Sequence, residues 1–185
     1  MTIRNLTIEK VIDAATEIAS EQGFEQITLT KTANQLNVQP QSMYRYVKNT
    51  ADLKSKVLAH NLKKMVDQSY KELLGLTGTQ AIKKYMTMVA FGEYTQVAPH
   101  DFANVSKYMD NSEVRYQYDR LNNLIPQLLS TFITDESRLR QLTQLLIDYM
   151  LGESVTYRNN DQDNQTQRRQ DFGDNIDNIL NMYKD

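Results

Sequence analysis

The chain has 185 residues, which is enough for one or two domains with a buried core. It contains no cysteine, which excludes a disulfide framework and a thiolate metal site. No run approaches the roughly 20 apolar residues of a membrane span, and the N-terminus lacks the apolar segment of a secretion signal. We therefore expect a cytoplasmic protein with no membrane partner, no cofactor and no metal.

The formal net charge is only −2, but it is unevenly distributed along the chain. Residues 26–64 carry seven basic side chains against Asp52 alone, a net charge of +6. Residues 65–185 carry 12 basic and 17 acidic side chains, a net charge of −5. Because local charge governs affinity for phosphates, residues 26–64 are the predicted nucleic-acid-binding part.

Two helices are predicted before the basic residues become dense. The first helix is predicted at residues 7–22, with Thr7 as its N-cap and Gly23 just past its end. The side chains of this helix that are predicted to be buried are Ile8, Val11, Ile12, Ala15, Ile18 and Ala19. A second helix follows Thr28, whose hydroxyl can accept a hydrogen bond from an amide that opens a helix.

A tight turn and a third helix are predicted next. Asn37 tolerates the left-handed conformation that such a turn needs, and Pro40 fits the first turn of a helix. At 100° per residue, this helix places its apolar side chains on one arc: Met43, Tyr46 and Val47. The opposite arc carries Gln41, Tyr44, Arg45 and Lys48. The pattern predicts a helix-turn-helix whose second helix enters the DNA major groove.

The segment from residue 33 to residue 53 resembles the DNA-binding head of TetR-family repressors. The resemblance rests on Ala33, Leu36, Asn37 and Val38, then on Met43-Tyr44-Arg45-Tyr46-Val47-Lys48-Asn49 and Leu53, and extends over roughly residues 7–60. In that family an apolar-Tyr-x-aromatic-(Phe/Val) run leads through a Lys or Asn turn to another helix. The chain departs from the family pattern at three positions: Asn37 replaces the usual Gly, Met43 the usual Leu, and Thr50 a frequent Lys.

Roles in DNA binding follow from side-chain chemistry. The forked guanidinium of Arg45 suits guanine O6 and N7, and the amide of Gln41 suits adenine. Ser42 and Tyr44 can contact a thymine methyl or a phosphate. Four further candidates are expected to hold the DNA backbone and set the register: Thr28, Thr30, Lys31 and Lys48. Gln39 is also a DNA-binding candidate. For Lys48 a solvated surface position remains an open alternative.

The rest of the chain is predicted to be helical, because no segment alternates with period 2. A linking helix capped by Thr50 starts at about residue 51. Further helices are expected at 79–95, 102–109, 112–132 with a Ser112 cap and a Pro126 kink, 134–157, and around Phe172 to Tyr183. The predicted class is all-α with about nine helices in total. A three-helix DNA-binding domain (1–50) precedes a helical effector-binding and dimerisation domain (51–185).

Two regions of the second domain are candidate binding surfaces. The middle is rich in Met and aromatic side chains, which line adaptable apolar pockets but also form ordinary cores. The candidate ligand residues are Tyr85, Met86, Met88, Phe91, Tyr94, Phe102, Tyr108, Met109, Tyr116 and Tyr118. The last two helices are interpreted as half of an intermolecular four-helix bundle, or alternatively as closing the monomer core. The candidate interface residues are Leu142, Leu146, Tyr149, Gly152, Phe172, Ile176, Ile179, Leu180 and Tyr183.

The resemblance implies a transcriptional repressor that binds a near-palindromic operator as a homodimer and is released by a small-molecule inducer. An enzyme is disfavoured, since only His60 and His100 are present and no catalytic motif occurs. His100 and Asp101 are too few for a metal shell, although they remain candidates for a ligand site. The alternative is a helical protein-interaction module that does not bind specific DNA sequences.

Overall fold

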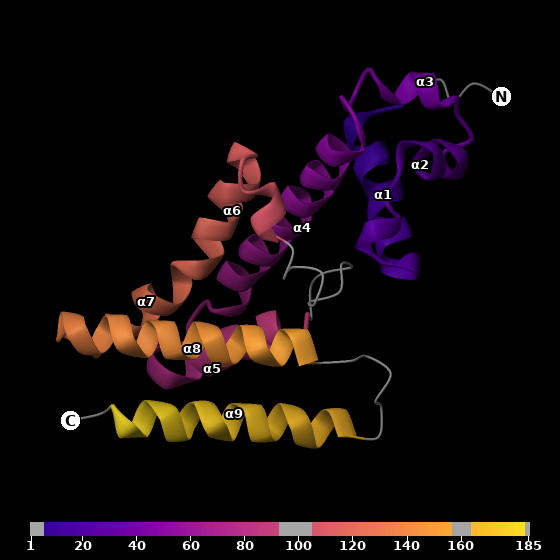
Figure 1. The fold of residues 1–185 in the computed structure, drawn as a ribbon. Helices are drawn as coiled ribbons and strands as arrows, with labels where there is room; N and C mark the ends of the chain where they lie inside the picture. The colour runs from indigo at the N-terminus through magenta and orange to yellow at the C-terminus, as the bar shows by residue number, and fades with distance from the viewer. Residues whose placement is uncertain (1–5, 93–104, 157–163, 184–185) are drawn as a thin grey trace. The chain divides into compact units, whose positions relative to one another are not determined.

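The computed structural model describes residues 6–92, 105–156 and 164–183. Over these residues the chain forms helices and no strands, which confirms the predicted all-α class (Figure 1). The elements are α1 (Ile8–Gln22), the 3₁₀ helix η1 (Phe24–Gln26), α2 (Leu29–Gln35), α3 (Pro40–Met43), α4 (Thr50–Glu72), α5 (Gly78–Ala90), α6 (Ser112–Asn122), α7 (Leu124–Leu129), α8 (Glu136–Thr156) and α9 (Gln165–Met182). None of these helices is long and apolar enough to cross a membrane.

The chain divides into two compact units. Unit 1 comprises residues 1–64 and 95–118, and unit 2 comprises residues 65–94 and 119–185. Helix α4 is continuous through the boundary at residues 64 and 65, so its first part belongs to unit 1 and its last part to unit 2. The predicted linking helix is therefore shared by the two units.

Unit 1 is built on α1, which begins and ends as predicted. The Thr7 hydroxyl accepts a hydrogen bond from the Lys10 amide, and Gly23 follows the last turn with φ +95°. The expected stripe is only partly buried, because Ile8 and Ile12 remain half-exposed. Both isoleucines border a cavity beside α4 instead of packing in the core. The α1 side chains that do pack there are Val11, Ala14, Ala15, Thr16, Ile18 and Ala19.

The turn between α2 and α3 places Asn37 in the left-handed region, with φ +53°. Asn tolerates this conformation better than residues with a larger or branched side chain, and Gly tolerates it best. We expect Asn37→Ala to lower the free energy of unfolding by about 1 kcal/mol, and Asn37→Gly to leave it unchanged or raise it slightly. Urea denaturation of the three proteins tests this; equal stability of the Ala and Gly variants would show that the turn is not strained.

Lys54 joins α4 to the corner after α1, a contact that spans 29 residues of sequence. Its ammonium donates to the carboxylate of Glu25 and, at 3.2 Å, to the Glu25 carbonyl, and it lies 5.6 Å from the centre of the Phe24 ring. Tyr108 packs edge-on against the same ring, with ring centres 5.8 Å apart. Lys54 is only 8 % exposed, so this lysine is a structural residue of unit 1.

The Lys54 hydrogen bond lowers the pKa of Glu25 below its ordinary value of 4.5. A carboxylate whose pKa is depressed by folding stabilises the fold above the unfolded-state pKa and stops doing so as the pH falls through the folded-state value. We expect Glu25→Gln to reduce stability at pH 7 by about 1 kcal/mol or less, since Glu25 is exposed. The deficit relative to the parent should shrink as the pH falls below 4.5. Urea titrations across this range, with Lys54→Met as a second variant, would contradict the assignment if the deficit were independent of pH.

Unit 2 has an aromatic centre where α5, α8 and α9 meet. Phe172 of α9 stacks on Tyr149 of α8, with ring centres 4.8 Å apart, and meets Phe91 edge-on at 5.5 Å. Tyr85 is fully buried, and its hydroxyl donates to the Leu121 carbonyl. Burial raises the pKa of Tyr85, so this phenol remains protonated in the folded protein.

A lysine from α5 crosses a glycine on α9. Lys83 Nζ lies 2.6 Å from Asp177 Oδ2, and a Cβ at Gly173 would come within 2.5 Å of Lys83 Cε. Gly173 therefore permits the close approach of the Lys83 side chain to α9. Gly152 has no neighbouring atom within 4 Å of its Cβ position and lies on the exposed side of α8.

Two predicted details of the helix expected at residues 112–132 are wrong. Helix α6 is capped by Asn111, whose Oδ1 accepts from the amides of Glu113 and Val114, whereas Ser112 is its first residue. The predicted kinked helix at 112–132 is two helices separated at Asn123. The break follows from Pro126, because a proline ring crowds the carbonyl four residues earlier, and that residue is the last of α6.

Candidate nucleic-acid interface

Helix α3, the predicted reading helix, is shorter than expected. It covers only Pro40–Met43, and the chain turns at residues 44–46. The amides of Tyr46 and Val47 both donate to the Met43 carbonyl, so the turn continues directly from the helix. The predicted helical arc that reached Lys48 is therefore wrong. Pro40 does occupy the first turn of α3, as predicted.

Three contacts hold this turn on unit 1. Met43 and Val47 are buried, at 0 % and 2 % exposure. The Tyr46 hydroxyl donates to the Leu6 carbonyl at 2.6 Å, so a residue 40 positions earlier anchors the turn. Consequently the polar side chains of this segment project from a fixed backbone, even though α3 has only four residues.

The predicted DNA-contacting side chains of α3 and its turn face solvent. Gln41, Tyr44 and Arg45 are exposed, and Tyr44 reaches 62 %. Gln39 and Lys48 flank them and are also exposed, while Ser42 is half-buried. An exposed tyrosine of this size on an otherwise packed segment is available to a partner.

The three candidates at the start of α2 have different surroundings. Thr28 caps α2 by accepting from the Lys31 amide at 3.1 Å, which confirms its predicted structural role. Thr30 is exposed. The Lys31 ammonium donates to Gln22 and Gln26 at 3.0 and 2.8 Å, so a phosphate would have to compete with two amide oxygens for it.

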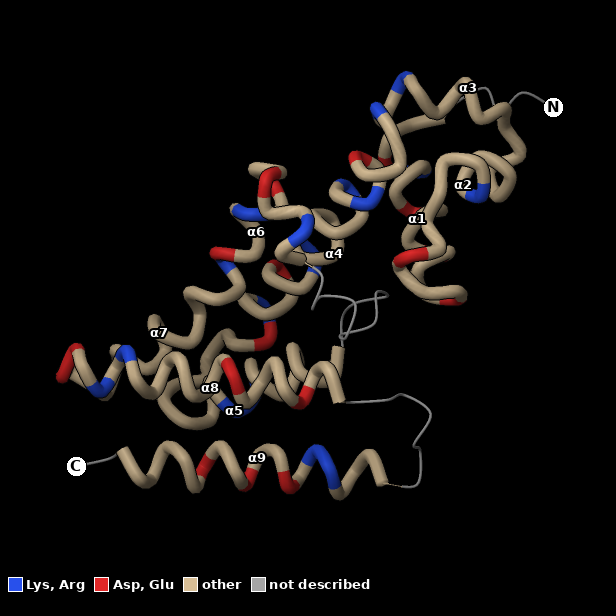
Figure 2. The backbone as a smooth tube through the Cα atoms, viewed as in Figure 1, with Lys and Arg blue, Asp and Glu red and all other residues tan. Residues whose placement is uncertain are grey.

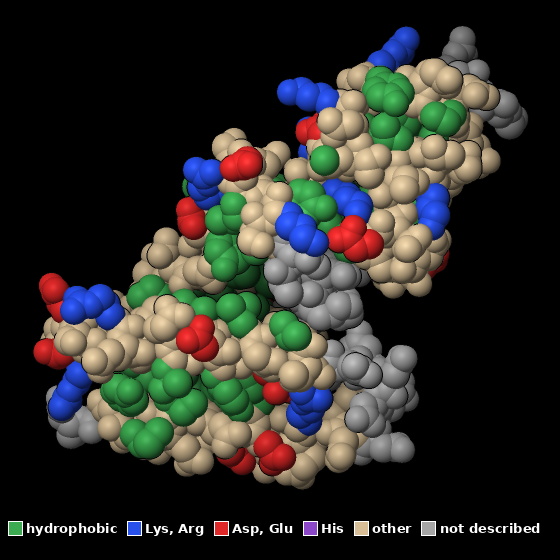
Figure 3. All heavy atoms as spheres, in the orientation of Figure 1, with side chains coloured by type: hydrophobic (Ala, Val, Ile, Leu, Met, Phe, Trp, Pro, Cys, Tyr) green, Lys and Arg blue, Asp and Glu red, His purple; other side chains and the backbone are tan. Residues whose placement is uncertain are grey.

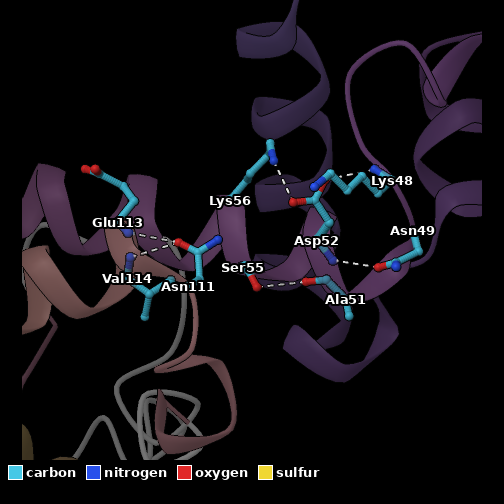
Figure 4. A network of polar contacts seen from close by, with 9 residues as sticks. All are labelled: Lys48, Asn49, Ala51, Asp52, Ser55, Lys56, Asn111, Glu113 and Val114. Atoms are coloured by element: carbon cyan, nitrogen blue, oxygen red, sulfur yellow. Dashed lines mark hydrogen bonds and ion pairs between the residues drawn. The ribbon is translucent and has the colours of Figure 1, made fainter.

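Two hydrogen bonds fix the start of α4 (Figure 4). Asn49 Oδ1 accepts from the Asp52 amide at 2.9 Å, and Asp52 Oδ2 accepts from the Lys48 amide at 2.8 Å. Asn49 is therefore the cap, and the prediction of a Thr50 cap is wrong, since Thr50 is already helical. The Asp52 carboxylate also pairs with Lys56 at 2.6 Å. Together these contacts orient the backbone that carries Lys48.

The positive charge of residues 26–64 is only partly available to a polyanion. Lys54 pairs with Glu25, and Lys56 pairs with Asp52. Basic residues nevertheless lie on the chain between α3 and α4, whereas several acidic residues lie on α8 and α9 (Figure 2). Arg45 and Lys48 thus supply the exposed positive charge at the reading turn. Sequence inspection missed the structural role of Lys54, because its partner lies 29 residues away.

The candidate ligand residues fall in both units. Four are buried in the core of unit 2, namely Tyr85, Met86, Met88 and Phe91. Four belong to unit 1, where Tyr108, Met109 and Tyr118 are half-buried and Tyr116 is 57 % exposed. Tyr94, Phe102, His100 and Asp101 lie outside the described residues. An effector pocket lined by these side chains stays a prediction.

The candidate interface residues of α8 and α9 also divide by exposure. Five are at most 1 % exposed inside unit 2, namely Leu142, Leu146, Phe172, Ile176 and Leu180. Tyr149, Ile179 and Tyr183 are half-buried, and Gly152 is exposed. The five buried residues therefore belong to the core of the monomer, as the alternative interpretation of this helix pair predicted. Of the candidate interface residues, only Tyr149, Gly152, Ile179 and Tyr183 are accessible to a partner.

A partly apolar surface, here called the α8–α9 face, remains on these two helices. It consists of Leu145, Tyr149 and Gly152 on α8 and Asn175, Ile179 and Met182 on α9, each set at i, i+4 and i+7. The Asn175 amide donates to the Tyr149 hydroxyl at 3.1 Å, so the two sets are neighbours. Leu145 is 39 % exposed and Met182 is 72 % exposed. Figure 3 shows hydrophobic side chains gathered along both helices.

Solved structures resemble this chain over nearly its whole length. The transcriptional regulator FadR from Bacillus subtilis, in complex with stearoyl-CoA, matches with a TM-score of 0.65 and 16 % identity, covering 96 % of this chain and 97 % of that one. The TetR-family transcriptional regulator PfmR from Thermus thermophilus matches with a TM-score of 0.68 and 14 % identity over 92 % and 97 %. BioQ bound to its double-stranded DNA operator matches with a TM-score of 0.56 and 18 % identity over 97 % and 98 %.

Sequence comparison gives a shorter match. The helix-turn-helix transcriptional regulator YobS from Bacillus subtilis (strain 168), which is uncharacterized, is 30 % identical over 63 residues. That segment is 34 % of this chain and 33 % of YobS, so the match spans about a third of the relative. No family model matches the chain.

These findings define the class of the molecule as an all-α helix-turn-helix fold with a helical C-terminal part. More narrowly, the chain has the fold of the TetR-family transcriptional regulators, as the resemblance at residues 33–53 predicted.

Proposed function

We propose that the protein is a DNA-binding transcriptional regulator that recognises a specific sequence through α3 and the turn after it. The observation that carries this proposal is the arrangement of the reading turn. Its apolar residues, Met43 and Val47, are anchored in the core, while Gln41, Tyr44 and Arg45 project outward. A rigid backbone that presents an amide, a phenol and a guanidinium suits the major groove.

The proposed regulator acts as a homodimer joined through the α8–α9 face. One copy of a four-residue helix and its turn reaches too few base pairs for strong binding. Two copies related by a two-fold axis would place two reading turns in successive major grooves, roughly 34 to 36 Å apart, on a near-palindromic operator. Repression is the mode of action typical of this family. The same fold in BioQ is bound to double-stranded operator DNA.

The proposed regulator is released from DNA by a small-molecule inducer in the helical part. FadR, which shares the fold, is described in complex with stearoyl-CoA, and EbrR is described as a multidrug binding protein. The stearoyl chain of the FadR ligand is apolar, in keeping with the Met- and Tyr-rich candidates of this chain. An inducer shifts the population only if it binds the released conformation more tightly than the DNA-bound one.

Selection of bound sequences from random duplex DNA tests the proposal. The full-length protein is expected to enrich a near-palindrome with two half-sites about one helical turn apart. Arg45→Ala provides the matched control and should enrich no sequence or a relaxed one. Failure of the parent protein to enrich any duplex would contradict the proposal and favour a protein-interaction module.

A further inference from the structure

A cavity of about 430 Å³ lies within unit 1, and α1, α4 and the start of α6 line it. Its apolar lining consists of Ile8 and Ile12 on α1 and Ala59 on α4. The two isoleucines are one helical turn apart and half-exposed, in contrast to their fully buried neighbours Val11 and Ala15. The cavity therefore exposes apolar surface that neither the core of unit 1 nor the reading turn uses.

The charged side chains that line the cavity are already engaged within the protein. Lys56 pairs with Asp52 at 2.6 Å, Lys63 has an interaction partner of its own, and the Glu113 carboxylate accepts from Gln117 at 2.7 Å. An anionic head group would meet the Glu113 carboxylate and no unengaged lysine, and a cationic one would meet two lysines. A charged ligand would thus lose hydration without gaining a counter-ion, so the cavity favours an uncharged head group.

Three polar groups at the cavity remain available to such a head group. Asn111 Oδ1 caps α6 by accepting from two backbone amides, but the Asn111 side-chain nitrogen makes no hydrogen bond within the described part of the chain. Figure 4 shows this nitrogen directed away from those amides. The Ser112 hydroxyl and the His60 imidazole are exposed and likewise have no hydrogen-bond partner among the described residues. A ligand oxygen can therefore be bound here by an amide, a hydroxyl or an imidazole.

We propose that this cavity binds an uncharged aliphatic alcohol, with its alkyl chain over Ile8, Ile12 and Ala59 and its hydroxyl group at Asn111 and Ser112. A hydroxyl group both donates and accepts, so it can accept from the Asn111 nitrogen while it exchanges a hydrogen bond with Ser112. The alkyl chain removes from water the isoleucine surface that the fold leaves exposed. A volume of about 430 Å³ is within the usual range for small-molecule sites.

This site is separate from the effector region expected around Tyr85 and Met86, which are buried in unit 2. Ile82 lies about one turn earlier on the same helix, α5, and its methyl signal reports on that region. Binding to the cavity is measured without DNA, so its outcome is independent of the proposed regulatory function.

The test is a titration of full-length protein, labelled with ¹³C in the Ile δ1 methyl groups, with octan-1-ol and with octanoate at neutral pH. We expect octan-1-ol to shift the Ile8 and Ile12 signals saturably, and octanoate to bind about tenfold more weakly because its carboxylate must be desolvated beside Glu113. Ile27 is buried in unit 1 away from the cavity lining and provides an internal control whose signal should not move. Shifts confined to Ile82 would place the alcohol in the effector region and overturn the proposal.

Two serines provide matched variants. Ser112 lines the cavity in the first turn of α6, and Ser137 occupies the first turn of α8 in unit 2; both are exposed. Ser112→Ala should weaken octan-1-ol about fivefold, the effect of one hydrogen bond, whereas Ser137→Ala should leave its affinity unchanged. Equal effects of the two variants would overturn the placement of the hydroxyl group. Equal affinity of the parent for octan-1-ol and octanoate, or unmoved Ile8 and Ile12 signals, would overturn the proposal as a whole.

Discussion

Gly152→Arg is expected to convert the proposed homodimer to a monomer and to weaken binding to a two-half-site operator by about 100-fold or more. Gly152 is exposed, and nothing lies within 4 Å of its Cβ position. A larger side chain therefore fits the monomer and obstructs only a partner on the α8–α9 face. The loss is large because the second half-site is bound with the high effective concentration that the dimer provides.

Sedimentation equilibrium and operator titration measure the two consequences together. The parent should sediment at twice the chain mass of 21.5 kDa, and the variant at that mass. Gln127→Arg, at an exposed position of α7, is the matched control and should remain dimeric. A Gly152→Arg protein that stays dimeric would place the interface elsewhere, and a monomeric parent would refute the dimer.

Arg45→Ala is expected to lower the affinity for the selected operator by about 1 to 3 kcal/mol and to relax the preference at one base pair of each half-site. Arg45 is exposed on a turn whose backbone is anchored by the Met43 carbonyl and the Tyr46 hydroxyl. Removal of its side chain should therefore leave the fold intact. The loss is specific because a guanidinium engages both acceptors of guanine.

Lys48→Ala provides the comparison for Arg45→Ala. Its side chain is exposed beside the start of α4, and only its backbone amide takes part in the Asp52 contact. We expect weaker binding to all duplexes alike. The slope of the logarithm of the affinity against the logarithm of the salt concentration should be smaller in magnitude by about one, because about one fewer counterion is released. Fluorescence anisotropy on operator and random DNA at several salt concentrations distinguishes the two variants. Equal losses on both DNAs for Arg45→Ala would exclude base recognition by Arg45.

Features of the fold that depend on neighbouring residues were predictable from the sequence. The caps at Thr7 and Thr28, the left-handed Asn37 and the helical start at Pro40 each follow from the chemistry of one residue and its next turn. Where two adjacent residues can both cap a helix, the sequence alone does not show which of them does so. Asn caps α4 and α6, although Thr and Ser next to it have the same capacity.

Features that depend on distant contacts were not predictable. The end of α3 at Met43 is linked to the anchoring of Tyr46 by a carbonyl 40 residues earlier. The burial of Lys54 depends on Glu25 and Phe24, which are far from it in sequence. Likewise, the apolar residues of α8 and α9 predicted only that the helices pack. Whether each residue faces the monomer core or a second copy depends on how α5 lies against them.

The hydrogen bond between the Tyr46 hydroxyl and the Leu6 carbonyl determines how small a working fragment of this protein can be. A synthetic peptide covering residues 28–48 would contain every proposed base-reading side chain but not the carbonyl that anchors their turn. Helices as short as α3 are not stable in water on their own, so such a peptide would be unstructured. Transplanting the recognition specificity to another scaffold therefore requires the chain from Leu6 onward, with the hydrophobic side chains of α1 and α4 included.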